Sequence, residues 1–363
     1  MLFINPVTTD DHFRYLWDGK VQNEGVNPFK FSPSELTIHH DDPLYQKVPY
    51  PETKTIYPPL SQTVFFLSYK FFGANVYGLK LIYLLFEAGT LIFLYMSLKI
   101  LKINSNYIFL YSFSPLVIFE FFINAHIDVL ILFFLMGSVY FALNKNSNYS
   151  MLLLGFSVLS KVYTLIFLPV YLICFFQQEK SIKNVLLNLL FFLIPFSLLI
   201  FYADGINNIF FQMFYYLKYW QFNNLPFTAI NTFLELFEIS NFSTVRLILI
   251  MLFFILYILI LSSKFNFIQK MYLAVFCYLF LSPTVHPWYL TVLVLFLPLY
   301  FNFTIYYWSG IIGFTNITVY YYLKDKQWFD ITIVLLIQYI LTIILAVFDL
   351  KKLKSKLSFA ATE

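Results

Sequence analysis

The sequence predicts an all-helical membrane protein, a polytopic bundle of about eleven transmembrane spans with a large first loop outside the membrane. Of its 363 residues, 60% are hydrophobic and only 12% are charged, whereas soluble domains carry about 25% charged residues. Phe and Tyr are unusually abundant, at 47 and 29 residues. Eleven apolar segments reach or approach the roughly 20 residues that a spanning helix needs. This composition excludes disordered, coiled-coil, disulfide-stapled and nucleic-acid-binding proteins.

The chain divides into three predicted parts: a loop at 1–75, a transmembrane domain at 76–350 and a tail at 351–363. The first part is polar and rich in proline, and within it 58–72 predicts a helix lying in the membrane interface, with proline at its start. The predicted spans are 76–98, 107–123, 127–143, 149–160, 162–176, 185–202, 244–262, 268–281, 285–303, 305–323 and 328–348.

Lysine placement predicts the orientation. With eleven crossings, one side receives eleven lysines (99, 102, 145, 180, 183, 264, 270, 351, 352, 354 and 356) and the short loops of the other side receive four (161, 218, 324 and 326). Cytoplasmic loops carry the excess of positive charge. The C-terminus is therefore predicted to be cytoplasmic, and the first loop to face the periplasm or lumen. Chemistry on that face excludes direct use of cytosolic nucleotides, and no Walker-type or dinucleotide-binding glycine motif is present.

The stretch TDDHFRYLWDGKVQNEGVNPF at 9–29 holds the most informative polar residues. Asp10 and Asp11 are adjacent, and the cation Arg14 and a third carboxylate, Asp18, follow. A general base near a membrane must stay ionised, and a neighbouring cation opposes the rise in pKa that burial and a second carboxylate cause. The acidic pair is therefore a catalytic candidate. The alternative is that Thr-Asp-Asp merely caps a helix.

A second polar corner joins two apolar segments. It contains Glu120, Asn124, His126 and Asp128, and ionisable residues beside apolar spans are functional candidates. Packing alone is the alternative. A divalent metal is also open but not favoured, because the spacing matches no dedicated site. Lys161 lies at the turn of a short hairpin, where its ammonium reaches an anion at headgroup depth or simply extends to water.

Three aromatic or imidazole residues complete the candidates. Tyr57 precedes two prolines, in a rigid turn that aims the interfacial helix. His286 and Trp288 lie in the corner SPTVHPWY, where an aromatic plane faces a sugar ring or belongs to the interfacial aromatic belt. Glu87 lies inside a span without an assignable role. Cys174 and Cys277 lie in apolar runs, where a thiol behaves as a small hydrophobe.

These motifs together resemble the C-type superfamily of glycosyltransferases, in particular bacterial polyprenyl-phosphate-mannose-dependent mannosyltransferases. The matching residues begin with the acidic pair at 10–11, FRYLWDG at 13–19, VQ at 21–22 and NPF at 27–29. They continue with IYPPL at 56–60 and Gln62, NAHID at 124–128, and HPWY at 286–289. The resemblance implies that Asp10 is the general base. It also implies a polyprenyl-monophosphate sugar donor, a glycan or glycolipid acceptor, and transfer with inversion. Members of the family begin with a transmembrane helix before the acidic pair, and only nine residues precede Asp10 here.

The expected activity is therefore transfer of a hexose at the extracytoplasmic face of a bacterial inner membrane. Mannose is the hexose that the resemblance favours. Arg14, Lys161 and His126 are the candidates for the donor phosphate. Asp18, Tyr57, Glu120, Asn124, Asp128, His286 and Trp288 are the candidates for substrate contacts. The alternatives are a lipid-linked sugar flippase, which needs polar groups through the membrane midplane, and a ligase or polymerase that uses pyrophosphate-linked donors.

Overall fold

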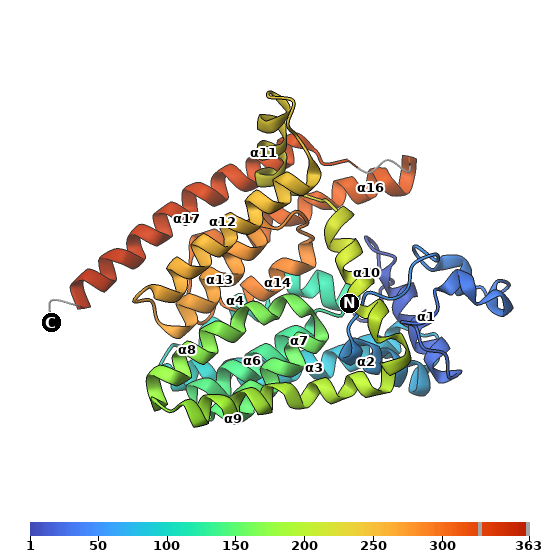
Figure 1. The fold of residues 1–363 in the computed structure, drawn as a ribbon, viewed down its shortest axis with the longest axis horizontal. Coiled ribbons are helices and arrows are strands. Elements are labelled where there is room, and N and C mark those ends of the chain that lie inside the picture. The colour runs from blue at the N-terminus through green and yellow to red at the C-terminus, as the bar shows by residue number, and fades with distance from the viewer. Residues whose placement is uncertain (326–328, 361–363) are drawn as a thin grey trace. The chain divides into compact units, whose positions relative to one another are not determined.

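The computed structural model describes residues 1–325 and 329–360, and in this part of the chain it is all-helical (Figure 1). An isolated bridge between Phe222 and Thr284 is the only β-pairing there. Five helices among the described residues are long and apolar enough to cross a membrane, or six if one bent pair is counted as a single span. Such helices are those of a membrane protein, while the predicted count of eleven spans is not confirmed.

The chain forms two compact units, each described by itself. Unit 1 comprises Met1–Ile108 and Val117–Trp220, and unit 2 comprises Phe109–Leu116 and Gln221–Glu363. The first half of the chain contains α1 (Asp11–Asn23), η1 (Pro33–Glu35), η2 (Thr37–His39), η3 (Tyr45–Lys47), α2 (Pro59–Phe72), α3 (Val76–Ile100), η4 (Ser105–Ile108), α4 (Phe109–Ser112), α5 (Pro115–Val117), η5 (Ile118–Ile123), α6 (Val129–Leu143), α7 (Ser147–Ser160), η6 (Val162–Phe167) and α8 (Leu168–Glu179).

The second half continues with the remaining helices. They are α9 (Ile182–Leu193), η7 (Ile194–Gly205), α10 (Ile206–Tyr219), α11 (Leu225–Glu235), α12 (Phe242–Ser262), α13 (Phe267–Leu281), η8 (Pro287–Leu290), α14 (Thr291–Val294), α15 (Phe303–Ile311), η9 (Ile312–Thr315), α16 (Asn316–Asp325) and α17 (Thr332–Ala360). The first residue of the predicted span 328–348 lies outside the described residues. The lysine at 326 and the end of the tail at 361–363 also lie outside them.

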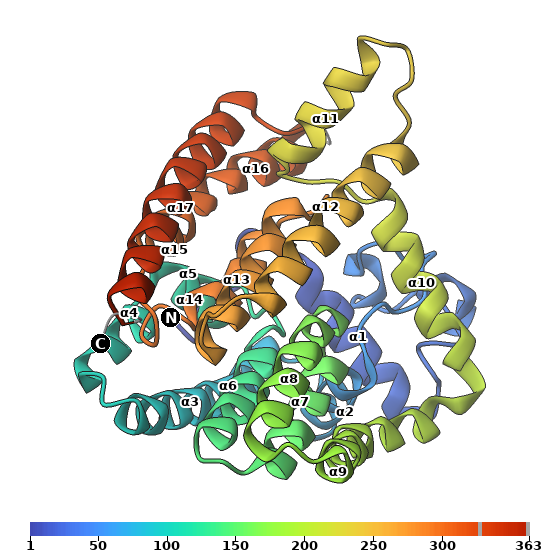
Figure 2. The same ribbon diagram turned by 60° about the vertical axis from the view of Figure 1, so that its left-hand side comes forward.

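In unit 1, α3, α6 and α7 lie side by side, as both views show (Figure 2). Hydroxyl groups join α6 to α7, since Ser138 and Ser150 each donate to the other's backbone carbonyl, at 2.7 and 2.8 Å. The predicted break at Lys161 is present: α7 ends at Ser160, and Lys161 has an extended backbone before η6. The helix predicted at 58–72 also forms, as α2, with Pro58 at its N-cap.

Two predicted spans of unit 2 are broken in the structure. The segment 285–303 forms only η8 and α14 before irregular turns, because Pro287 and Pro298 lack the N–H that a continuous helix requires. The segment 305–323 divides into α15, η9 and α16 around Gly310 and Gly313, and glycine disfavours a helix interior. By contrast, α12 is a single helix matching its prediction, while α17 runs past the predicted end of its span at 348 to Ala360.

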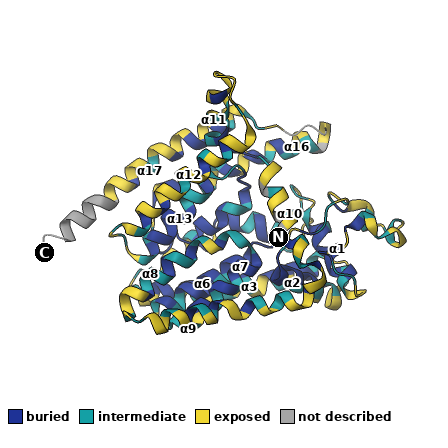
Figure 3. Ribbon diagram, in the orientation of Figure 1, coloured by how far each residue is buried: buried dark blue, intermediate teal, exposed yellow. Residues whose placement is uncertain are grey.

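The burial pattern supports a lipid-facing surface. Figure 3 shows long exposed stretches on α12 and α17, and darker, buried residues on α6 and α7. The exposed side chains on these outer faces are large and apolar, such as Phe254, Leu259 and Ile344, which are each more than half exposed. Soluble proteins rarely expose so large an apolar surface to water. The hydrocarbon chains of a lipid bilayer are apolar too and suit such a surface.

The helices that carry the site, α1 and α2, cross at very short range. A Cβ atom at Gly19 would lie 2.4 Å from the carbonyl oxygen of Phe65, so only glycine permits this approach. Next to the crossing, Tyr15 stacks on Phe65 with ring centroids 4.7 Å apart. The crossing fixes the N-terminal end of α1, where the acidic pair lies.

Candidate active site

The acidic pair lies at the start of α1. Asp10 is exposed and occupies the N-cap position, yet its side chain makes no capping hydrogen bond. The hydroxyl of Thr9 accepts the Asp11 N–H instead, at 3.2 Å. Capping alone therefore does not account for Asp10. A carboxylate at a helix N-terminus is also favoured by the helix dipole.

Asp11 faces the inside of unit 1 and is partly accessible to water. Burial raises the pKa of its carboxyl from the ordinary 3.8 to about 7, and the charges of Asp10 and Asp128 act in the same direction. The ammonium of Lys161 and a hydrogen bond from Tyr57 oppose this rise. Sequence reasoning assigned the stabilising cation to Arg14; in the structure that cation is Lys161.

Lys161 and Asp128 form the second half of the site. The Lys161 Nζ donates to Asp128 Oδ1 at 2.8 Å, and the lysine side chain is 23% exposed while the carboxylate is 3% exposed. Asp128 is the N-cap residue of α6, and Lys161 caps the C-terminal end of α7. Two helix termini thus bring an accessible ammonium near Asp11.

Tyrosine hydroxyl groups line the interior of this cluster. Tyr57 hydrogen-bonds to Asp11 and receives a hydrogen bond from Tyr15, and the two rings meet edge to face at 5.0 Å. Burial raises the pKa of the Tyr57 hydroxyl well above its ordinary value, so it remains a neutral donor. Sequence reasoning found Tyr57 but not Tyr15, whose place in the helical motif gave no separate signal.

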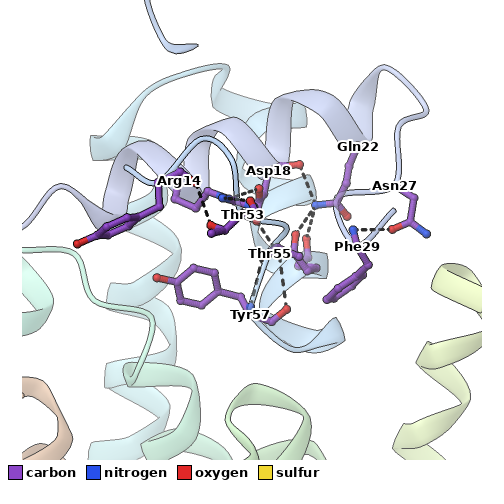
Figure 4. Close-up of polar contacts among 10 residues, drawn as sticks. Arg14, Asp18, Gln22, Asn27, Phe29, Thr53, Thr55 and Tyr57 are labelled. Atoms are coloured by element: carbon purple, nitrogen blue, oxygen red, sulfur yellow. Dashed lines mark hydrogen bonds and ion pairs between the residues drawn. The ribbon is translucent and has the colours of Figure 1, made fainter. Parts of the chain in front are cut away.

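Arg14 and Asp18 form a buried pair one helical turn inside α1 (Figure 4). The Arg14 Nε donates to Asp18 Oδ1 at 2.8 Å, and its Nη1 donates to the carbonyl of Thr53 at 2.9 Å. The third nitrogen, Nη2, is buried without a hydrogen-bond partner among the described residues. The guanidinium group is thus fixed by two hydrogen bonds to protein groups.

Asp18 is fully buried and contacts protein groups on both oxygens. Its Oδ2 accepts a 2.8 Å hydrogen bond from Gln62, whose amide also donates to Thr55 at 2.7 Å. Gln22 donates to the Gln62 side chain at 2.8 Å. The motif residues of α1 and α2 therefore form one polar network, in which Asp18 orients Arg14. Gln62 was quoted in the sequence motif, but its role was not predicted.

The corner before α6 brings three of its predicted residues together. Glu120, Asn124 and His126 are at most 1% exposed. Asn124 Nδ2 donates to Glu120 Oε2 at 3.1 Å, and His126 Nε2 lies 3.6 Å from the same oxygen. Asn124 also binds the backbone of Thr8, two residues before the acidic pair. The fourth residue, Asp128, instead turns to Lys161.

Lys80 is a site residue that sequence reasoning missed. It lies on α3, is fully buried, and donates to the carbonyls of Ile4 and Ile123 at 2.6 and 2.8 Å. The available signal was its position inside the predicted span 76–98, since an ionisable residue in an apolar span is rare.

His286 and Trp288 belong to unit 2, whereas the acidic pair belongs to unit 1. Their rings stack with centroids 4.4 Å apart and an interplanar angle of 5°. His286 is buried and Trp288 is partly exposed, so the indole presents a flat surface. In the part of the chain that the structure describes, no group of three or more His, Cys, Asp or Glu side chains is arranged to hold a metal ion.

Comparison with known proteins finds a similarity in the first half of the chain. Residues 1–177 match the family model described as "Alpha-(1->6)-mannopyranosyltransferase, N-terminal domain". No curated protein and no solved structure gives a significant match. The matched range contains the acidic pair, the Arg14 network, the Asp128 corner and Lys161. The resemblance found in the sequence is thereby confirmed over residues 1–177, which are similar to the N-terminal domain of an α-mannopyranosyltransferase family, and this similarity supports a mannosyltransferase enzyme.

Proposed function

We propose that the protein transfers mannose from a polyprenyl-phosphate donor to a hydroxyl group of a glycan or glycolipid, with inversion, at the extracytoplasmic face of a bacterial inner membrane. One observation carries the proposal. Asp10, the Tyr57 hydroxyl and the Asp128–Lys161 ion pair all act on Asp11. A base and a cation in one cluster match the two needs of the reaction, which are removal of a proton and stabilisation of a departing phosphate.

Asp10 is the proposed base. Its carboxylate is exposed and does not cap α1, so an incoming hydroxyl can reach it. In the proposed step, Asp10 takes the hydroxyl proton as the oxygen bonds to C1 of the sugar. The C1–O bond to phosphate breaks, and its electron pair leaves with the polyprenyl phosphate. A β-linked donor then gives an α-mannoside. Asp11, held by Tyr57, positions the pair and tunes its charge.

Two cations are proposed for the departing phosphate. Lys161 is partly exposed, so its ammonium is accessible to an anion. Arg14 keeps its Nη2 donor within the buried network. Preorganised donors of this kind stabilise charge that develops in the transition state. His126 is fully buried beside Glu120, so its proposed role is to hold this corner in place.

The substrate contacts are assigned by exposure. Tyr57, in unit 1, is partly exposed and is proposed to contact the sugar. In unit 2, Trp288 is partly exposed and stacks on His286, and its contact with a sugar stays a prediction. Asp18, Glu120, Asn124 and Asp128 are buried and act through the groups they hold. The family description names an α-(1→6) bond, for which the acceptor is a primary hydroxyl at C6 of a mannoside.

The eleven-span topology, with the first loop outside and the C-terminus cytoplasmic, remains part of the proposal. The lysine distribution supports it. A membrane-impermeant maleimide tests it on two variants at exposed positions, Asp41→Cys in the first loop and Lys145→Cys between α6 and α7. Labelling from outside is expected for Asp41→Cys alone, and labelling of Lys145→Cys alone would invert the topology.

The activity is tested with purified protein in liposomes, radiolabelled mannosyl polyprenyl phosphate and a mannoside acceptor. Asp10→Asn is expected to lower transfer at least 100-fold, whereas Asp41→Asn, an exposed control in the same loop, retains it. A normal rate for Asp10→Asn would refute the base assignment. Release of a lipid pyrophosphate would support the ligase alternative, and lipid movement without a glycoside would support the flippase.

A further inference from the structure

Lys80 joins two segments that lie far apart in the sequence. Its ammonium donates to the backbone carbonyls of Ile4 and Ile123, at 2.6 and 2.8 Å. The lysine is fully buried, and a buried ammonium is costly unless its hydrogen bonds are made. The two carbonyls therefore define a specific binding position for Lys80 rather than a solvent-facing side chain.

Asn124 holds the same joint from the other side. Its Oδ1 accepts the N–H groups of Val7 and Thr8, both at 3.3 Å, and its Nδ2 donates to the Thr8 hydroxyl at 2.8 Å. A third contact comes from α3, where the Tyr77 hydroxyl donates to Asn5 at 2.8 Å. Residues 4–8, here called the strap, are thus bound at three points.

The strap leads directly into the acidic pair. Thr9 follows it, and the Thr9 hydroxyl accepts the N–H of Asp11. On the other side of the joint, the chain runs from Asn124 to Asp128, which starts α6 and binds Lys161. The electrostatic interactions of Asp11 with Asp128 and Lys161 therefore depend on where the strap lies.

We propose that Lys80 is a positioning residue for glycosyl transfer: by tying the strap to Ile123, it sets the acidic pair opposite the Asp128–Lys161 pair. The proposal rests on the proposed function for the reaction that it serves. Both hydrogen bonds of the Lys80 ammonium described above go to backbone carbonyls, so its effect passes through the backbone of the strap. Displacement of a reacting group by about 1 Å can reduce a rate about 100-fold.

The test compares Lys80→Met with Lys99→Met, the same substitution at an exposed position of the same helix. For Lys80→Met we expect kcat to fall about 10- to 100-fold, while KM for the lipid donor changes less than about twofold. Hydrogen exchange gives a readout that is independent of activity: the amides of Val7 and Thr8 are expected to exchange faster in Lys80→Met and to remain unchanged in Lys99→Met.

The outcomes separate the two proposals. Unchanged exchange at Val7 and Thr8 in Lys80→Met, or faster exchange with a normal kcat, overturns the positioning role. If wild-type protein transfers nothing from the polyprenyl-phosphate donor, the proposed function fails, and exchange alone then decides whether Lys80 holds the strap. If Lys80→Met does not fold, Thr8→Val tests the joint at a partly exposed position, with the same expected fall in kcat.

Discussion

Replacing Asp11 by Asn should stabilise the protein at pH 8 while impairing transfer. Burial and the neighbouring carboxylates raise the pKa of Asp11 from 3.8 to about 7. The folded protein therefore holds a proton that the unfolded chain releases between these two pH values. Stability falls as pH rises through that interval and stays lower above pH 7. An Asn side chain resembles the protonated acid and removes the loss.

The magnitude follows from the same values. A rise in pKa from 3.8 to about 7 corresponds to about 4 kcal/mol, and the partial exposure of Asp11 reduces this to about 2 kcal/mol. For a chain of this length, that is a rise of about 3 °C in the unfolding midpoint. Thermal unfolding in detergent, followed by circular dichroism, should show the rise at pH 8 and little change at pH 4.

Asp41→Asn serves as the control, because Asp41 is exposed in the same loop. It should leave the midpoint unchanged at both pH values. The reasoning is refuted if Asp11→Asn is no more stable than the wild type at pH 8. An equal shift at both pH values would also contradict it, since the titration of Asp11 would then not be the cause.

Further predictions concern packing and the cations of the site. Gly19→Ala should destabilise the protein by about 1–3 kcal/mol, because its Cβ would meet the α2 backbone at 2.4 Å, whereas Gly310→Ala meets nothing within 4 Å and should be neutral or slightly stabilising in thermal unfolding. Lys161→Met leaves the Asp128 carboxylate buried without a cation, at a cost of about 3 kcal/mol; adding Asp128→Asn should recover stability but not transfer, and recovery of both would exclude Lys161 from the phosphate site. Arg14→Lys keeps the charge but not the planar fork, so the donor KM should rise about tenfold, and an unchanged KM would remove Arg14 from the donor site.

Local signals predicted much of the helical structure. Pro58 marks the start of α2, because a proline in the first turn of a helix loses no hydrogen bond. The polar Lys161 interrupts the apolar run at the point where α7 ends. The segments 285–303 and 305–323 are not continuous helices, although their hydrophobicity is high throughout. There, Pro298 and two glycines interrupt the helices, and a window average of hydrophobicity does not register such breaks.

The candidate site was predictable where its partners are close in sequence. Arg14 and Asp18 are one helical turn apart, so their pairing follows from helix geometry. Partners that are far apart in the sequence could not be predicted in this way. The helical pattern does not reveal that Gln62 reaches Asp18, or that Lys161 rather than Arg14 stabilises the charge of Asp11. These contacts depend on how α2 and α7 pack within unit 1, which the hydrophobic pattern of each separate segment does not reveal.

The separation of the two cations has a physical consequence for the site. Arg14 is already paired with Asp18 at 2.8 Å, and the cation that lowers the pKa of Asp11 is Lys161, which also pairs with Asp128. Two inward carboxylates, Asp11 and Asp128, thus face one ammonium, and Asp11 is left only half ionised near pH 7. An arriving phosphate would compete for that ammonium, raise the pKa of Asp11 further and favour its protonated form. Asp10, which is exposed to water, is the proposed base, and comparison of the Asp10→Asn and Asp11→Asn variants separates the two proposed roles.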